Sequence, residues 1–364
     1  MNFRRCFFTA LAAMLVVSSV SAAKTDSLVY HDALSLPLMG TLAPDASKAY
    51  SRLPDSLKGK VRDELWALGL NSAGLSVRFR SDASTLALRW KALNKFNMNH
   101  MTATGIRGLD LYVLDGDSAW TTVSSARPLF NSHQSTSLVA TDMLPEMREY
   151  MIYLPLYDGV DSIYIGVDSA ARVLPPLVDL PVRRRPLVMY GTSILQGGCA
   201  SRPGMAHTNI LQSRLNREVI NLGFSGNARL DPEIAHLMAS CDASVFVIDA
   251  LPNCTADLVS ERMADFIGII RAAHPDTPIL LVESPLFPIG RFNREVSSTI
   301  AAKNNVLRDI YLHLSAADAN LHYFKGEDVL GECVEGTVDN YHLTDLGFTK
   351  FADALQPVIE NLMK

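Results

Sequence analysis

The sequence lacks a marked excess of either charge. Its 364 residues include 33 Lys and Arg against 38 Asp and Glu, which gives a formal net charge of -5. A nucleic-acid-binding domain needs a basic surface that displaces counterions from phosphates, so this balance argues against that class of protein. Apart from the extreme N-terminus, no apolar run approaches the roughly 20 residues of a membrane-spanning helix. We therefore expect no nucleic-acid partner, and no membrane association once the N-terminal segment is removed.

Cysteines are also scarce: the sequence contains five, of which four lie beyond the N-terminal segment. None of these four belongs to a Cys-x-x-Cys pair, so we expect no metal site and no other cofactor. An exported chain can pair four thiols in three ways. A chain of this size buries a large core and rarely needs disulfides, so we expect unpaired thiols, with a bridge between Cys199 and Cys333 as the alternative. The four residues are Cys199, Cys241, Cys254 and Cys333.

The N-terminus has the pattern of an export signal. Arg4 and Arg5 precede an apolar stretch at residues 7–17, and the small residues of Val20-Ser21-Ala22-Ala23 follow it. This order of a positive head, an apolar core and a small-residue site is typical of a secretory signal peptide. We expect residues 1–23 to be cleaved off and the mature protein to be periplasmic or secreted. A retained membrane anchor is the alternative, for which the stretch is short.

The residues between this signal and the middle of the chain form short alternating stretches. Residues 75–80 and 86–90 alternate apolar with polar side chains, which places one face of each strand in a core. Further short strands are expected at residues 109–114, 150–155 and 162–167. Because turns separate these strands and little helical periodicity lies between them, we expect residues 24–183 to form an antiparallel β-sandwich.

The pattern changes after Pro175-Pro176. Short apolar runs without alternation, typical of strands covered on both faces, now alternate with segments of helical spacing. The runs lie at residues 187–190, 219–222, 244–248 and 279–282. Strand alternating with helix predicts a parallel sheet joined by right-handed crossovers, so we expect residues 184–364 to form an α/β domain. Reactive groups in such domains gather at the carboxyl ends of the strands.

Four loops near these strand ends carry residues with chemical potential. Each loop alone has an ordinary explanation, because Ser, Gly and Asn commonly cap helices or form turns and an Asp-x-x-His spacing arises by chance. The occurrence of all four loops in this order within one domain is harder to explain as chance. The carboxylate of Asp339 can hold one ring nitrogen of His342 while the other faces a nucleophile, for which the imidazole then serves as a general base. The loops contain Ser193, the stretch at residues 221–227, Asn253, and Asp339 with His342.

Two familiar motifs are absent around the serine. Leu195 stands where the nucleophile elbow of α/β-hydrolases has its second glycine, so Gly191-Thr192-Ser193 is a different kind of turn. No Gly-Lys-Ser/Thr follows, which excludes a phosphate-binding loop.

From residue 186 to residue 364 the sequence resembles the SGNH (GDSL-type) hydrolases. The resemblance implies a three-layer α/β/α fold with Ser193 as nucleophile and Asp339 with His342 as its acid-base pair. It also implies an oxyanion hole made by the backbone of Ser193, by Gly226 and by Asn253. Gly226 is preferred to the earlier glycine of its loop because the second block of the family reads Asn, three residues, Ser, Gly, as Asn221 and Ser225-Gly226 do here.

The upstream stretch Gly108-Leu109-Asp110-Leu111-Tyr112 resembles the GxDLY motif of the β-sandwich that precedes this catalytic domain in a set of bacterial esterases. Two blocks depart from the family pattern. The first reads Gly-Thr-Ser in place of Gly-Asp-Ser, and the third reads Leu-Pro-Asn in place of Gly-x-Asn. Neither change removes a residue with a direct chemical role, so we expect activity with an altered acyl pocket.

The resemblance implies a serine esterase that works through an acyl-serine intermediate. We expect its substrate to be an acylated small molecule or polysaccharide, with a short acyl (acetyl) group on carbohydrate as the first choice. A thioesterase, a lysophospholipase and a catalytically silent carbohydrate-binding protein are the alternatives. Arg291 and Phe292, in the loop after the fourth strand, are candidate substrate-binding residues. Four aromatic side chains are candidate sugar platforms, although core packing is the favoured role: Trp90, Tyr112, Trp120 and Tyr157.

Overall fold

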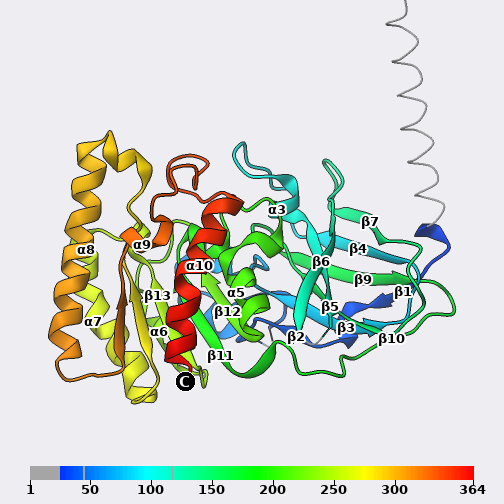
Figure 1. Cartoon of the computed structure of the whole chain (residues 1–364), viewed down its shortest axis with the longest axis horizontal. Coiled ribbons are helices and arrows are strands. Elements are labelled where there is room, and N and C mark those ends of the chain that lie inside the picture. Colours follow the sequence, from blue (N-terminus) through cyan, green and yellow to red (C-terminus); the bar gives the residue numbers. More distant parts are fainter. Residues whose placement is uncertain (1–24, 44–45, 117) are drawn as a thin grey trace, which may run out of the picture.

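The computed structural model describes residues 25–43, 46–116 and 118–364, arranged as a β-rich part and an α/β part side by side (Figure 1). The predicted signal peptide, residues 1–23, lies outside the described residues. Within them, no helix combines the length and the apolarity that crossing a membrane requires.

The N-terminal part is a sandwich of two antiparallel sheets, as predicted. The strand order is β1-β9-β4-β7 in one sheet and β10-β3-β8-β5-β6 in the other, with β2 paired to β3. The strands are β1 (Val29–Asp32), β2 (Leu38–Met39), β3 (Ser76–Ser81), β4 (Leu86–Ala92), β5 (Leu109–Asp115), β6 (Ala119–Ala126), β7 (Gln134–Ala140), β8 (Arg148–Tyr153), β9 (Val160–Val167) and β10 (Val173–Leu174).

Alternation along the strands fills the space between the two sheets. Val77 and Phe79 of β3 and Leu88 of β4 are fully buried in this core. The outer face of the second sheet is covered too, because Tyr153 on β8 donates its hydroxyl proton to the backbone oxygen of Asn209 on α5 (His207–Leu215), 3.2 Å away. All four candidate sugar platforms are buried: Trp90 in the sandwich core, Tyr112 and Trp120 on this covered face, and Tyr157 against the α/β part.

The C-terminal part is a parallel sheet between two layers of helices, which confirms the predicted α/β/α class. The strand order is β12-β11-β13-β14-β15. The strands are β11 (Val182–Gly191), β12 (Arg217–Gly223), β13 (Val245–Asp249), β14 (Ile279–Val282) and β15 (Leu321–Phe324). The helices α6 (Pro232–Ala239), α7 (Ala256–Ala273) and α8 (Arg294–Ser315) pack on one face, and α5, α9 (Glu327–Leu330) and α10 (Asp345–Leu362) pack on the other.

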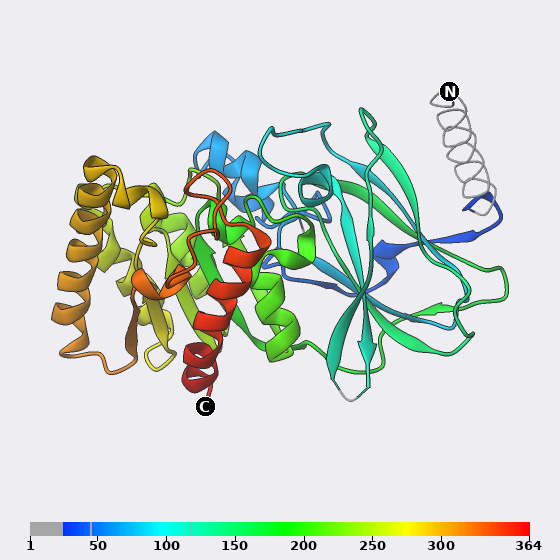
Figure 2. The same cartoon turned by 45° about the horizontal axis from the view of Figure 1, so that its top comes forward.

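One segment of the N-terminal half crosses to the α/β part. Residues 53–69, including α2 (Asp63–Gly69), lie over the parallel sheet (Figure 2), whereas Tyr50 just before them packs in the sandwich core. Leu53 and Leu65 are fully buried there, in the same apolar cluster as Tyr190 of β11. The core of the α/β part therefore includes side chains from the N-terminal half of the chain. The predicted boundary at residues 183/184 falls inside β11.

The thiols of the α/β part are not cross-linked. All four cysteines beyond the N-terminal segment are free, so the alternative of a bridge between Cys199 and Cys333 is not realised. Cys199 is buried, as we expected for a thiol in a large core.

Candidate active site

Ser193 lies where the order of the parallel strands reverses. β11 runs between β12 and β13, and a crevice opens at the carboxyl end of such a strand. Ser193 is the first residue of the short helix α4 (Ser193–Gln196), and the Thr192 hydroxyl caps this helix by accepting the Ile194 N–H at 3.3 Å. The turn thus places the serine side chain at the sheet edge, with 9% of the residue exposed.

A chain of hydrogen bonds links Ser193 to the Asp-x-x-His segment. Nε2 of His342 lies 3.0 Å from Oγ of Ser193, and Nδ1 of His342 lies 2.7 Å from Oδ2 of Asp339. The other carboxylate oxygen of Asp339 accepts the backbone N–H groups of His342 at 2.8 Å and of Tyr341 at 3.1 Å. Burial raises the pKa of Asp339, but the hydrogen bonds from His342 outweigh it, and the net pKa is lowered. An ionised carboxylate can orient the imidazole and stabilise its charged form.

The imidazole of His342 packs closely against the nucleophile turn, which is the turn at residues 192–199 that contains Ser193. Gly198 follows α4, and a Cβ atom at this position would lie 3.0 Å from Cδ2 of His342 and 2.7 Å from the hydroxyl of Tyr157. That hydroxyl donates to the backbone oxygen of Ser193 at 3.2 Å. Only a residue without a side chain leaves room for both neighbours.

Asn253 lies in the turn after β13 and faces the same cavity as Ser193 and His342. Its Oδ1 accepts the Ala228 N–H at 3.3 Å, which leaves the NH₂ group to donate into the cavity. Gly226, in the loop after β12, has a φ of +68°, a left-handed conformation that glycine adopts without strain. Gly226 is not among the residues that line this cavity.

Gln196 positions the Gly226 loop. Its Oε1 accepts the Ser225 N–H at 3.0 Å, and its Nε2 donates to the backbone oxygen of Leu156 at 3.0 Å. The fully buried Gln196 side chain thus ties the nucleophile helix to the neighbouring loop and to the N-terminal half of the chain.

The cavity that contains Ser193 has a volume of about 380 Å³. Its wall is mainly apolar, with a polar end at Glu295, Thr299 and Lys303. Lys303 is 6% exposed, and its ammonium group donates to the backbone oxygen of Leu251 at 2.9 Å, in the turn that carries Asn253. Burial lowers the pKa of Lys303. The apolar lining residues are Ile194, Pro252, Phe287, Val296 and Ile300.

Comparison with known proteins identifies the family of this site. The profile described as GDSL-like Lipase/Acylhydrolase family matches residues 184–360. A profile described as the N-terminus of Esterase_SGNH_hydro-type matches residues 28–173. A GDSL-like lipase from Bacteroides ovatus ATCC 8483 has 30% sequence identity, with 92% of this chain and 98% of that chain covered and a TM-score of 0.86.

The chain belongs to the GDSL-like lipase/acylhydrolase family. It is an ester-hydrolysing enzyme whose two parts are the two that the sequence resemblance indicated. No curated protein matches this chain.

More distant solved structures share the fold of this GDSL-family enzyme. The salicylyl-acyltransferase SsfX3 from a tetracycline biosynthetic pathway has 18% identity and a TM-score of 0.72, with 92% of this chain and 95% of that chain covered. A family two carbohydrate esterase from Cellvibrio japonicus has 13% identity and a TM-score of 0.60, with 93% and 98% covered.

A second cavity, of about 710 Å³, lies where the N-terminal half of this GDSL-family enzyme meets the Gly226 loop. Ser225 and Asn227, on either side of Gly226, line it together with Tyr157. The remaining lining residues come from α2 and from the loop after β4: Glu64, Ala67, Leu68, Asn71, Asn94, Lys95, Phe96 and Met98. The N-terminal half therefore supplies most of a wall next to the candidate oxyanion loop.

The two residues predicted to bind substrate lie away from Ser193. Arg291 lines a separate cavity of about 280 Å³, which shares Phe287 and Ile300 with the cavity that contains Ser193. Phe292 is 87% exposed and lines neither cavity. Their part in substrate binding stays a prediction.

Sequence reasoning missed Gln196 and Lys303, which shape this site, and it considered Tyr157 only as a sugar platform or a core residue. Each acts on a backbone oxygen or N–H group that is distant along the chain, so no local motif contains them. Gln196 had the strongest signal, because it follows Ser193 within the same helix.

Proposed function

We propose that this enzyme is an exported serine esterase that removes short acyl groups, acetyl first among them, from carbohydrate. The observation that carries the proposal is the hydrogen-bond chain from Asp339 through His342 to Ser193, beside the Asn253 amide. This arrangement pairs a nucleophile with a base, and the base with a group that orients it.

In the proposed reaction, Oγ of Ser193 attacks the ester carbonyl while Nε2 of His342 takes the hydroxyl proton. The resulting oxyanion accepts hydrogen bonds from the backbone N–H groups of Ser193 and Gly226 and from the Asn253 amide. Collapse of this intermediate breaks the ester bond, and His342 passes its proton to the departing alcohol. A water molecule then releases the acyl group by the same steps, with His342 again acting as base.

The size and lining of the cavity that contains Ser193 favour a short acyl group. At about 380 Å³ it is near the lower end of small-ligand sites, which span about 300–1,000 Å³. Ile194, Phe287 and Ile300 offer an apolar surface next to Ser193 for a short hydrocarbon group.

The second cavity suits a sugar as the alcohol part of the ester. Asn71 supplies an amide donor and acceptor for hydroxyl groups, and Phe96 supplies an aromatic surface that is 48% exposed. The fold shared with a family two carbohydrate esterase supports a carbohydrate substrate.

Export is proposed from the N-terminal pattern of Arg4, Arg5 and the apolar stretch that follows. Mass spectrometry of the protein recovered from the periplasm or medium checks this, with a mature N-terminus after Ala22 or Ala23 expected. Recovery of the intact N-terminus in the membrane fraction would contradict it.

The decisive experiment measures acetate release from acetylated polysaccharides and from a chromogenic acetate ester. Ser193→Ala is expected to abolish turnover and to keep the wild-type circular dichroism spectrum. The matched control is Ser298→Ala on the exposed surface of α8, which should retain full activity.

The substrate panel also separates the alternatives. Preference for long-acyl or thioester substrates over acetyl esters would replace the proposed substrate with that of a lysophospholipase or thioesterase. Sugar affinity without turnover would indicate a carbohydrate-binding protein. Near wild-type activity in Ser193→Ala would refute the assignment of the nucleophile.

A further inference from the structure

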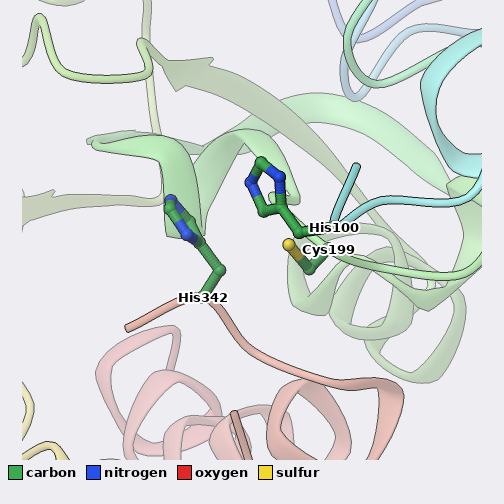
Figure 3. Close-up of side chains that lie close together, drawn as sticks. All are labelled: His100, Cys199 and His342. Atoms are coloured by element: carbon green, nitrogen blue, oxygen red, sulfur yellow. The ribbon is translucent and has the colours of Figure 1, made fainter. Parts of the chain in front are cut away.

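Three side chains with metal-binding atoms meet beside the nucleophile turn: His100, Cys199 and His342 (Figure 3). Their ligand atoms all lie within 4.8 Å of one another. The ring centroids of His100 and His342 are 5.6 Å apart. The residues come from the loop after β4, the turn after α4 and the loop before α10.

This group escapes the search for Cys-x-x-Cys pairs because its members are far apart in sequence. Two imidazoles and one thiolate form a donor set that Zn²⁺ prefers, at about 2.0–2.1 Å for nitrogen and 2.3 Å for sulfur in tetrahedral geometry. Ligand atoms around such an ion lie roughly 3.5 Å apart. The site must therefore contract by about 1 Å, and the exposed His100 side chain can supply that movement.

Both imidazoles already have oxygen partners on one ring nitrogen. Nδ1 of His342 lies 2.7 Å from Oδ2 of Asp339, and Nδ1 of His100 lies 3.0 Å from Oδ1 of Asn99. Metal-bound histidines typically have such a partner, which fixes the ring and presents the other nitrogen to the ion. Here Nε2 of each ring is the nitrogen left for a metal.

We propose that His100, Cys199 and His342 form an inhibitory binding site for Zn²⁺. Cys199 gives up its thiol proton to water on binding, and the sulfur and the two Nε2 atoms then hold the ion. Nε2 of His342 is the atom that faces Oγ of Ser193 at 3.0 Å. A lone pair engaged with zinc cannot accept the serine proton, so the occupied enzyme is inactive. This consequence rests on the proposed role of His342, whereas zinc binding itself does not.

The ligand atoms also determine which metal ions the site binds. Mg²⁺ and Ca²⁺ prefer oxygen ligands, and a site with two nitrogens and one sulfur offers them little. Inhibition by Zn²⁺ without inhibition by Mg²⁺ at the same concentration is therefore expected.

Binding is tested without reference to activity by using Co²⁺ as a spectroscopic probe for zinc. The full-length mature protein is expected to show a near-ultraviolet charge-transfer band from thiolate to cobalt, which Zn²⁺ removes by displacement. Cys199→Ser should lack the band. Cys333→Ser, which changes a free thiol outside the group, should keep it. An absent band in the wild type, or a band that persists in Cys199→Ser, would overturn the proposal.

Inhibition is tested with a chromogenic ester, each variant being compared with its own metal-free rate. Zn²⁺ should inhibit the wild type reversibly, with recovery on addition of a chelator. His100→Gln and Cys199→Ser should each raise the half-inhibiting zinc concentration about tenfold or more, since loss of even an outer partner of a metal ligand costs about 10–100-fold in affinity. An unchanged half-inhibiting concentration in both variants would refute the inhibitory site. If the protein proved inactive on esters, the cobalt band would still decide whether the metal binds.

Discussion

At the scale of single residues, the backbone of Ser193 is held more firmly than its side chain. Its carbonyl oxygen accepts the N–H groups of Gly197 at 3.1 Å and Gly198 at 2.7 Å, besides the Tyr157 hydroxyl. These contacts keep the turn in place while Oγ meets only His342 among the described hydrogen bonds. Reaction rates depend steeply on such positioning, because a small displacement removes the near-attack geometry.

Asn253→Ala tests the proposed oxyanion hole. Loss of its amide donor should lower kcat about 10²- to 10³-fold and leave KM within about twofold, because the interaction forms mainly in the transition state. Steady-state kinetics on an acetate ester measure this. A rise in KM at unchanged kcat would show that Asn253 binds the ground state instead.

Gly198→Ala tests the close packing of the imidazole. The added Cβ would lie 3.0 Å from His342 and 2.7 Å from the Tyr157 hydroxyl, so at least one of them must move. We expect kcat to fall about tenfold or more, with partial recovery when Tyr157→Phe removes the nearer atom. Gly268→Ala on α7, where a Cβ meets nothing within 4 Å, is the control. Equal kinetics for the two alanine variants would contradict this account.

Sequence reasoning reached some of these residues and not others for a physical reason. Ser193 and Asn253 follow β11 and β13 closely, so the parallel-sheet pattern places them at one edge of the sheet. His342 lies in the loop before α10, and its Asp-x-x-His spacing together with the family resemblance indicated it. Tyr157 and Lys303 act through contacts with distant backbone oxygens, and the chain pattern around them is that of ordinary packing. The proposed zinc site could not be predicted either, because three separate loops bring His100 and Cys199 next to His342.

At the scale of elements, the carboxyl end of β12 depends on a buried arginine from the N-terminal half. The guanidinium of Arg52 donates to the backbone oxygens of Asn221 at 3.2 Å and Gly223 at 2.6 Å, just before the Gly226 loop. It also donates to the backbone oxygens of Leu68 and Asn71. Burial lowers the pKa of Arg52 to about 9, and the carbonyl dipoles stand in for a carboxylate partner.

Arg52→Met should lower the free energy of unfolding by about 3 kcal/mol, because the buried carbonyls lose their charged donor. Arg52→Lys should not restore it, since an ammonium group cannot reproduce the planar set of contacts. Urea unfolding followed by circular dichroism measures both. The exposed control Arg127→Met is expected to stay within about 0.5 kcal/mol of wild type. Equal unfolding midpoints for Arg52→Met and the control would contradict the prediction.

Strands of the sandwich in which apolar and polar side chains alternate strongly were predictable from the sequence, and strands without this alternation were not. β3 and β4 alternate cleanly, so both sheets of the sandwich were foreseen in outline. β6 and β7 are rich in Ser and Thr, and their apolar faces are too weak to register as a pattern. β15 is an edge strand with half-buried His322 and Tyr323, so it lacks the continuous apolar run of its neighbours.

At the scale of the whole molecule, stability depends on an uncharged histidine between helices of the α/β part. His207 of α5 is fully buried, stacked on Phe348 and Phe351 of α10. Neither ring nitrogen has a hydrogen-bond partner among the described residues. Burial lowers the pKa of His207 from 6.5 to about 3. Between these values the unfolded chain binds a proton that the folded protein does not, so stability falls as the pH falls below about 6.5.

His207→Phe should remove this dependence. The wild type is expected to lose about 2 kcal/mol of unfolding free energy between pH 7 and pH 5 through His207, at roughly 1.4 kcal/mol per pH unit below the unfolded pKa. The variant should lose correspondingly less, and His236→Gln, at an exposed histidine, should behave as wild type. Urea titrations at several pH values measure the slopes. Parallel slopes for wild type and His207→Phe would show that this ring does not govern acid stability.

The position of residues 53–69 on the parallel sheet has a practical consequence for anyone who would recombine this enzyme with its relatives. A chimera joined near residue 184 would lose Leu53 and Leu65 and leave a hole in the apolar cluster that also contains Tyr190. Residues 184–364 therefore cannot be transferred to another protein by themselves. A working chimera must include residues 53–69, so the two parts of this enzyme are best engineered together.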